Sequence, residues 1–337
     1  MQPIDFRSDT VTRPNAEMRR IMASAEVGDD VFHDDPSINH LEHYAAELLG
    51  FEAALFAPSG TQTNLIALLV HCQRGDEYLV GQDAHTYKYE GGGAAVLGSI
   101  QPQPISNQPD GSIALADITA AIKPDDFHFA RTRLLTLENT IGGKVVPLDY
   151  LAAAEKLARG RGLGLHLDGA RLFNAAVKLG TDASQITRHF DSVSVCLSKG
   201  LGAPVGSLLL GSRDFVHAGR RWRKMLGGGM RQAGILAAVG EYVLRNNVPR
   251  LAEDHANAAL LANGLAQVPA LKVTLPQTNI VFVDVAAEHA EKFAKHLGAN
   301  HVLVTGSTRQ RWVTHLDVDR EQVETALRIA HEYFAAS

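Results

Sequence analysis

Short apolar runs rich in β-branched residues alternate with helical patterns from about residue 36 onward. This alternation is typical of a mostly parallel sheet that helices cover on both faces. The first helix is expected to follow Asp35-Pro36 and to stop at Gly50. The expected strands lie at 53–57, 77–80, 99–104, 133–138, 163–168, 192–197 and 205–210. A seven-stranded α/β domain is therefore the predicted core.

The pattern changes after about residue 248. A helix over 249–266 leads into expected strands at 271–275, 279–285, 301–304 and 311–316, with helices at 288–297 and 319–335. This order predicts a smaller α+β domain. Because 337 residues exceed the usual size of one core, we divide the chain into a large domain, 1–248, and a small C-terminal domain, 249–337.

Composition excludes several classes of protein. The net charge is −5 and no basic cluster suits nucleic acid. No apolar run approaches the ~20 residues that span a bilayer, and the first ten residues carry three charges where a signal peptide needs an apolar core. Cys72 and Cys196 lie in apolar segments and are interpreted as core thiols of a reducing compartment. We expect no membrane or nucleic-acid partner and a cytoplasmic location.

Two polar residues follow predicted strands at the edge where α/β sheets bind ligands. Lys199 comes after the apolar run 193–197, and Asp168 ends the run 163–167. A lysine that forms an imine with an aldehyde and an aspartate that keeps a pyridinium protonated are the reagents of pyridoxal-phosphate chemistry. Lys199 alone fits a surface or capping lysine equally well. Together with Asp168 and Arg171, it favours a pyridoxal 5′-phosphate site.

Three further positions could serve this cofactor. The turn Ser59-Gly60-Thr61 opens a helix, where free backbone N–H groups suit a phosphate, although the serine also fits a simple N-cap. Arg231 follows three glycines and is a second phosphate candidate; the alternative is a flexible connector. His85 follows the strand 77–80 and could stack on the pyridine ring, but a lone histidine is more often structural.

Several segments together resemble the threonine aldolase family of pyridoxal-phosphate enzymes. The segments are 5–12, 27–32, 34–36, 58–61, 166–171, 197–204, 227–232 and 311–315. The resemblance extends over essentially the whole chain. The resemblance implies an aspartate-aminotransferase-like fold of type I. It also implies cleavage of L-threonine and L-allo-threonine to glycine and acetaldehyde. Such enzymes are typically homotetramers with active sites built from two subunits, so the segment 1–35 is expected to contribute to the site and the interface.

The resemblance also implies residue roles. Lys199 is the Schiff-base lysine, Asp168 the partner of the ring nitrogen, and Arg171 a neighbour of the ring hydroxyl or the substrate carboxylate. The remaining roles fall to Gly60 and Thr61 for the phosphate, Arg231 for the phosphate of a neighbouring subunit, Ser8 and Arg311 for the substrate carboxylate, and His85 or His128 for the base and the substrate hydroxyl. Arg309 has the same strand parity as Arg311, and only the motif favours the latter. Phe32 stands where the family often has tyrosine.

Alternative functions remain on the same scaffold. β-Elimination, racemisation and transamination use the same cofactor motifs, and a non-catalytic pyridoxal-phosphate carrier is a more distant reading. A nicotinamide enzyme is excluded because no G-x-G-x-x-G follows an early strand. No histidine or acidic spacing predicts a metal site. The preference between threonine and allo-threonine stays open.

Overall fold

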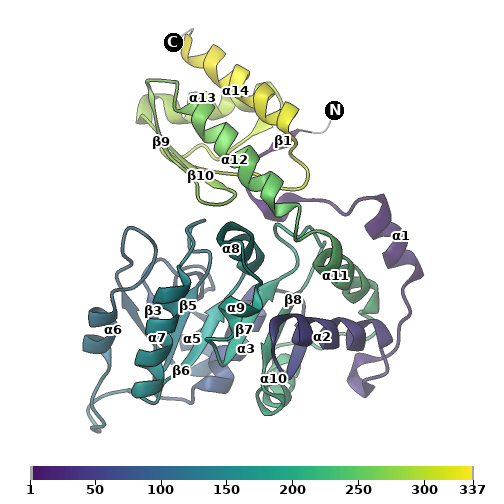
Figure 1. The fold of residues 1–337 in the computed structure, drawn as a ribbon, viewed down its shortest axis with the longest axis vertical. Helices are drawn as coiled ribbons and strands as arrows, with labels where there is room; N and C mark the ends of the chain where they lie inside the picture. The colour runs from purple at the N-terminus through teal and green to yellow at the C-terminus, as the bar shows by residue number, and fades with distance from the viewer. Residues whose placement is uncertain (1–2, 336–337) are drawn as a thin grey trace.

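The computed structural model describes residues 3–335 in two lobes (Figure 1). The lower lobe contains a large sheet with its helices, and the upper lobe contains a smaller sheet with helices α12 to α14. Both ends of the chain lie in the upper lobe. None of the helices within these residues is long and apolar enough to cross a membrane.

The large sheet has seven strands in the order β2-β8-β7-β6-β5-β3-β4. They are β2 (Ala53–Ala57), β3 (Asp76–Gly81), β4 (Gln101–Ile105), β5 (Arg131–Glu138), β6 (Gly164–Asp168), β7 (Ser192–Cys196) and β8 (Ser207–Gly211). Only β8 runs antiparallel to its neighbours; the other pairs are parallel. The predicted α/β sheet is confirmed, and the carboxyl ends of β2, β3, β5, β6 and β7 share one edge.

Helices of the lower lobe pack around this sheet, with α3 against β7 and β8 and α7 against β6. Helix α2 shows how the sequence sets its ends. Asp35 Oδ1 accepts a hydrogen bond from Ile38 N at 3.0 Å, and Gly50 closes the helix with φ of 75°. The helices are α1 (Ala16–Ser24), α2 (Pro36–Leu49), α3 (Gly60–His71), α4 (His85–Lys88), α5 (Gly93–Gly98), α6 (Leu115–Ala121), α7 (Leu148–Gly160), α8 (Leu172–Leu179), α9 (Ser184–Thr187), α10 (Arg213–Met225) and α11 (Gly234–Asn246).

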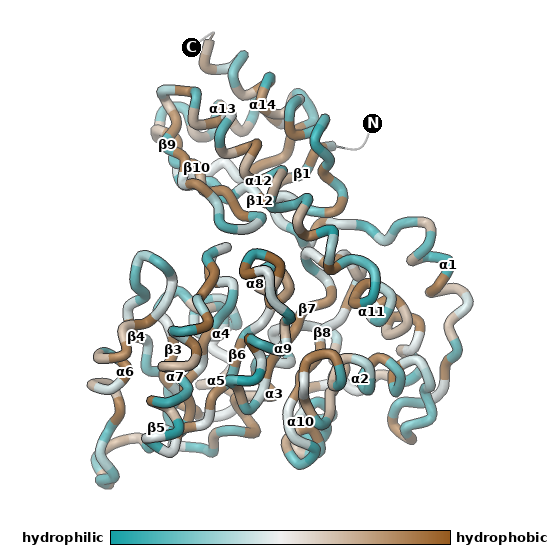
Figure 2. Tube along the Cα trace, in the orientation of Figure 1, coloured by the Kyte–Doolittle hydropathy of each residue, from teal (hydrophilic) through white to brown (hydrophobic). Residues whose placement is uncertain are grey.

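Each lobe has its own apolar core, and Figure 2 shows hydrophobic segments inside both. In the large sheet Leu165, Leu167 and Val193 are fully buried. A parallel strand that is covered on both faces reads as a continuous apolar run rather than an alternating one. This burial explains why the strands ending in polar site residues were visible in the sequence.

The upper lobe is built on an antiparallel sheet of order β12-β10-β9. Its elements are α12 (Leu251–Leu265), β9 (Leu271–Thr274), β10 (Ile280–Val285), α13 (Ala287–Ala299), β11 (Val302–Leu303), β12 (Arg309–Val313) and α14 (Arg320–Ala335). Strand β1 (Ile4–Asp5) pairs in parallel with β11. Phe6, fully buried, packs against Trp312 with ring centroids 5.3 Å apart. The start of the chain therefore completes the upper lobe.

Several strand boundaries differ from the prediction by one or two residues, and the last strand differs most. The strand expected at 311–316 lies at Arg309–Val313. The ladder begins earlier because Arg309 pairs with Asp284 of β10. Beyond Val313, the side chains of Thr314 and His315 bond to the carbonyl oxygens of Asp254 and Asp5, each at 2.6 Å.

Candidate active site

Polar side chains gather where the parallel strands end. Glu138 and Asp168 are the last residues of β5 and β6, and they are direct neighbours in the strand register. Lys199 lies three residues beyond the end of β7, and His85 begins α4 after β3. Ser59 follows β2 and caps α3. The shared edge therefore carries most of the residues that the sequence predicted for the cofactor.

Asp168 is held by two donors. Asn64 Nδ2 donates to Asp168 Oδ2 at 2.8 Å, and the Ala170 amide donates to Oδ1 at 3.0 Å. The carboxylate is 3% exposed. Each oxygen keeps a second lone pair, so Asp168 can accept a further donor such as a protonated ring nitrogen.

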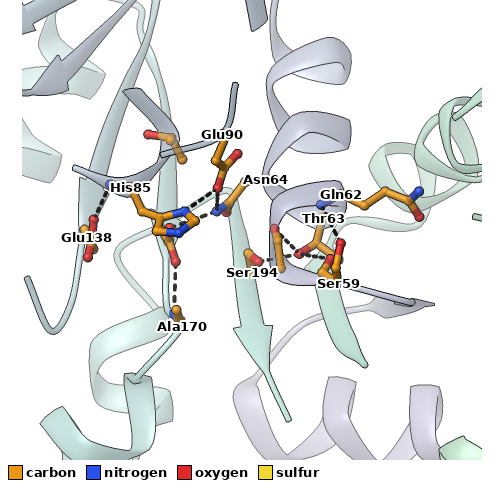
Figure 3. Close-up of polar contacts among 12 residues, drawn as sticks. Ser59, Gln62, Thr63, Asn64, His85, Glu90, Glu138, Ala170 and Ser194 are labelled. Atoms are coloured by element: carbon orange, nitrogen blue, oxygen red, sulfur yellow. Dashed lines mark hydrogen bonds and ion pairs between the residues drawn. The ribbon is translucent and has the colours of Figure 1, made fainter. Parts of the chain in front are cut away.

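His85 lies between two carboxylates, as Figure 3 shows. Its Nδ1 is 2.8 Å from Glu90 Oε1, and its backbone N–H donates to Glu138 Oε2 at 2.7 Å. The hydrogen bond with Glu90 raises the pKa of His85 despite the opposing effect of burial, and the charge of Asp168 adds to the rise. Because Glu90 occupies Nδ1, the other ring nitrogen is the one left for a ligand.

Glu138 is a half-buried acid beside another acid, Asp168. Burial and the negative charge of Asp168 raise the pKa of Glu138 to about 8. The hydrogen bond from His85 N opposes that rise. The protonated form of Glu138 is therefore favoured at neutral pH.

Lys199 lies among these groups without a hydrogen-bond or ion-pair partner of its own within residues 3–335. The positive charge of Lys199 acts to lower the pKa of Asp9, and it opposes the rise in the pKa of Glu138 and of Cys196. The ammonium group therefore lies near all three residues. A lysine without a committed partner in a half-buried position is available for covalent chemistry with an aldehyde.

Helix α3 begins with unoccupied backbone donors. Ser59 Oγ accepts from Gln62 N at 3.2 Å, so the serine acts as the N-cap. In the described part of the chain the amides of Gly60 and Thr61 have no acceptor. A side chain at Gly60 is excluded because a Cβ atom there would lie 2.6 Å from Cys196 Sγ. The N-cap reading and an anion site are therefore compatible here.

Arg171 is committed to a partner that the sequence did not suggest. Its Nε and Nη2 donate to the two oxygens of Asp9 at 2.8 and 2.6 Å. Asn279 Nδ2 approaches the same carboxylate at 3.3 Å. Burial by itself raises the pKa of Asp9, but the Arg171 guanidinium outweighs burial and holds the pKa well below its usual range.

Arg311 has no ion-pair partner among the residues from 3 to 335. Burial and the neighbouring positive charge of Arg171 lower the pKa of Arg311. By contrast, Arg309 pairs with Asp284 at 3.3 Å on the surface. The structure thus separates two arginines that strand parity alone could not, and it leaves Arg311 as the cation available to an anionic ligand.

Three predicted residues have other surroundings within one chain. His128 precedes β5, at the end of that strand opposite to Glu138, and its ring contacts Asp126. Arg231 is largely exposed and pairs with Asp29 at 3.0 Å. Ser8 caps a short 3₁₀ helix by accepting from Thr10 N at 3.2 Å, directly before Asp9. Their proposed roles stay predictions, and those of His128 and Arg231 need a second subunit.

The ligand atoms of His85, Glu90 and Asp168 lie within 4.8 Å of one another, as in a metal site. However, the Asn64 amide donates one N–H to Glu90 at 2.9 Å and the other to Asp168 at 2.8 Å. These two hydrogen bonds hold the carboxylates of Glu90 and Asp168 close together without a cation. Hydrogen bonding alone therefore accounts for this cluster.

The sequence reasoning missed four contributors: Asp9, Asn64, Glu90 and Glu138. Asp9 lies inside the segment 5–12 that was already assigned to the site, whereas Asn64 lies three residues beyond the segment 58–61. Glu138 was visible as the end of a predicted strand. Glu90 gave no signal, because its partner Asn64 lies in helix α3, 26 residues earlier in the sequence.

Comparison with known proteins places the chain among lyases. The profile of the family described as "Beta-eliminating lyase" matches residues 5–288. The chain is 58% identical over 320 residues to a "Low specificity L-threonine aldolase" of Escherichia coli (strain K12), covering 95% of this chain and 96% of the relative. It is 44% identical to a "Probable low-specificity L-threonine aldolase 2" of Arabidopsis thaliana, covering 99% and 98%. A Leishmania major threonine aldolase structure, 22% identical, aligns with a TM-score of 0.85 over 98% of this chain and all of the other.

Proposed function

The chain belongs to the beta-eliminating lyase family and, within it, to the low-specificity L-threonine aldolases, and we propose that it cleaves L-threonine and L-allo-threonine to glycine and acetaldehyde with pyridoxal phosphate. The observation that carries this proposal is the arrangement of Lys199, Asp168 and Arg311. Within residues 3–335, Lys199 has no hydrogen-bond or ion-pair partner and Arg311 has no counter-ion, while Asp168 is held by two donors. The charges of Lys199 and Arg311 both act on Asp9, so the two cations lie near the same residue. This set matches an aldehyde, a ring nitrogen and an amino-acid carboxylate.

The residues present fit the cofactor. Lys199 would hold its aldehyde carbon, Asp168 its ring nitrogen, and the free amides of Gly60 and Thr61 its phosphate. When bound, pyridoxal phosphate would supply an electron sink for the carbanion that cleavage of the Cα–Cβ bond leaves. The Ala170 and Asn64 donors keep Asp168 in place while it neutralises the ring cation.

Arg311 would orient the substrate. A guanidinium binds a carboxylate through two parallel hydrogen bonds, and the geometry is specific. Arg171 shapes the same region but gives its own hydrogen bonds to Asp9. The substrate carboxylate is therefore assigned first to Arg311, with Ser8 as a neutral donor from the segment next to Asp9.

His85 is the proposed base for the β-hydroxyl proton. Glu90 holds Nδ1 at 2.8 Å, so Nε2 faces the ligand space. The raised pKa of His85 suits proton acceptance near neutral pH. His128 remains the alternative base, and it would have to come from a neighbouring subunit.

We infer a homotetramer with active sites between subunits and a cytoplasmic location. Large apolar side chains on the surface support an interface, among them Phe32, Tyr89, Val96 and Phe127 at 70%, 63%, 76% and 92% exposure. Sedimentation of the purified protein would test the oligomeric state.

Product analysis tests the reaction. The cofactor-loaded protein is mixed separately with L-threonine and L-allo-threonine, and glycine with acetaldehyde is quantified against ammonia with 2-oxobutanoate. Glycine and acetaldehyde support the proposal, and the two rates give the β-carbon preference. Ammonia and keto acid would instead support β-elimination, the reaction that the family description names, and would overturn the aldolase assignment while leaving the cofactor site intact.

A further inference from the structure

Asn64 lies in the buried interior of helix α3 and faces two carboxylates. It is 2% exposed. Its Nδ2 donates to Glu90 Oε1 at 2.9 Å and to Asp168 Oδ2 at 2.8 Å, so both amide hydrogens are in use. Figure 3 shows this bridge beside His85.

A second layer lies behind Asn64. Its Oδ1 is 3.2 Å from Nε2 of His166, which is fully buried in β6. His166 Nδ1 is 2.8 Å from Ser192 Oγ in β7, and the same hydroxyl is 2.7 Å from His71 Nε2 at the end of α3. Burial lowers the pKa of His166 to about 3 and that of His71 to about 4, so both rings are neutral.

These contacts allow one arrangement of hydrogens. The two carboxylates can only accept from Asn64, so Asn64 Oδ1 must face His166 and accept from Nε2–H. A neutral imidazole has one N–H, and His166 Nδ1 therefore accepts the Ser192 hydroxyl hydrogen. Ser192 Oγ in turn accepts from His71 Nε2–H. Each donor in this series of hydrogen bonds, from His71 to Asn64, therefore points toward Asp168.

We propose that Asn64 and His166 are positioning residues that hold the Asp168 carboxylate for the cofactor through this one-way chain of hydrogen bonds. The inference rests on the proposed function and deepens it, because it names the residues that fix the partner of the ring nitrogen. Asp168 Oδ2 has Asn64 as its donor and Oδ1 has the Ala170 amide. Removal of the Asn64 donor would leave the Ala170 amide as the donor that holds Asp168, and Glu90 would lose its bridge to Asp168.

The first test measures cofactor affinity by equilibrium dialysis. Asn64→Asp is nearly isosteric, but it replaces the donor with a third carboxylate. Loss of the hydrogen bond from Asn64 to the charged Asp168 is expected to weaken cofactor binding about 10- to 100-fold, because hydrogen bonds to charged groups are among the stronger ones. His166→Leu removes the donor to Asn64 and is expected to weaken binding as well, whereas His166→Gln keeps an N–H in that place and should recover most of the affinity.

Ser194→Ala is the matched control. The Ser194 hydroxyl bonds to Thr63 Oγ1 at 2.6 Å. Thr63 precedes Asn64 on helix α3, and Ser194 lies on the same strand as Ser192. The variant loses a buried hydrogen bond of similar kind that is not part of the series from His71 to Asp168. Its cofactor affinity should therefore stay within about twofold of the wild type. Urea unfolding of every variant shows whether it still folds.

The second test is spectroscopic and independent of turnover. In cofactor-free protein with ¹⁵N-labelled histidine, His166 should show the neutral tautomer with hydrogen on Nε2 at pH 7 and remain neutral at pH 5. In the loaded protein, Asn64→Asp should shift the pH titration of the cofactor absorption band, and Ser194→Ala should not.

An Nδ1–H tautomer at His166, or wild-type cofactor affinity and absorption in Asn64→Asp, would overturn the proposal. Failure of the proposed function looks different, because a wild-type protein that binds no pyridoxal phosphate or forms no glycine leaves the tautomer result unchanged.

Discussion

Arg171 donates two hydrogen bonds to Asp9, a residue 0% exposed that arrives from the far N-terminal end of the chain. This pair neutralises one of two neighbouring arginines and leaves the charge of Arg311 for a ligand. The site therefore depends on a contact between the first few residues and a strand end of the large sheet.

Replacement of Arg311 by alanine should weaken use of the amino acid substrate. The loss of charge-assisted hydrogen bonds to the carboxylate is expected to lower kcat/KM about 10- to 100-fold. Arg309→Ala is the control, because Arg309 forms an exposed ion pair with Asp284 that is worth at most about 1 kcal/mol. Steady-state kinetics that ranked the two variants in the opposite order would refute the assignment of the carboxylate site.

Replacement of Lys199 by alanine should abolish turnover. The reason is that no other lysine stands at the end of β7 to bond with the aldehyde. Borohydride treatment followed by mass measurement should attach the cofactor to the wild-type chain and not to the variant. Substantial residual cleavage of threonine by purified Lys199→Ala would contradict the role.

Asp9→Asn should destabilise the protein. Breaking a buried ion pair from one side costs about 3–5 kcal/mol, because Arg171 keeps an uncompensated charge next to Arg311. Since the pKa of Asp9 is lowered on folding, its contribution is present above the unfolded value of about 3.9 and is lost as pH falls below it. Urea unfolding of cofactor-free protein at pH 7 and pH 3.5 should show a large gap from the wild type at pH 7 and a smaller one at pH 3.5. Equal gaps at both would argue against an ionised Asp9.

Glu138→Gln should flatten the dependence of stability on pH. Burial and the charge of Asp168 raise the pKa of Glu138 to about 8, so its contribution is present below about pH 4.5 and is lost as pH rises toward 8. Glutamine mimics the protonated acid and can still accept from His85 N. Between pH 5 and pH 8 the unfolding free energy of the cofactor-free wild type should fall more steeply than that of the variant, by up to about 1.4 kcal/mol per pH unit. Parallel curves would show that Glu138 is ionised in the folded state.

Removal of divalent metals should leave product formation unchanged. Asn64 already donates to Glu90 and Asp168, so hydrogen bonds hold these two carboxylates together without a cation. The rate is measured after dialysis against a chelator and again after addition of magnesium, manganese or zinc. A loss that one of these ions restores would point to a metal that the cluster binds.

The large sheet was predictable because its strands are covered on both faces. Runs such as 163–167 and 193–197 are continuous and apolar, and the polar residue that follows each run marks the ligand edge. The strand ending at Val313 was misplaced by two or three residues at its ends, because cross-strand partners such as Asp284 set its limits rather than its own pattern.

Site residues were predictable where a single position carries the signal. Lys199 and Asp168 each end an apolar run, whereas Asp9, Asn64 and Glu90 act through partners far along the chain. No local pattern reveals such a partner. Strand parity could not separate Arg309 from Arg311, since both lie on one face of the strand, and only the family motif favoured Arg311.

The pairing of β1 with β11, with Phe6 packed against Trp312, also sets an order of events during synthesis. The residues made first cannot complete this packing until residues 302–313, near the other end of the sequence, have left the ribosome. A large lobe that folded before this packing would leave Arg171 without its counter-ion, Asp9. Nascent chains released before the upper lobe is complete should hold the sheet but not the finished ligand edge, so the protein acquires a working site only as its final segment docks.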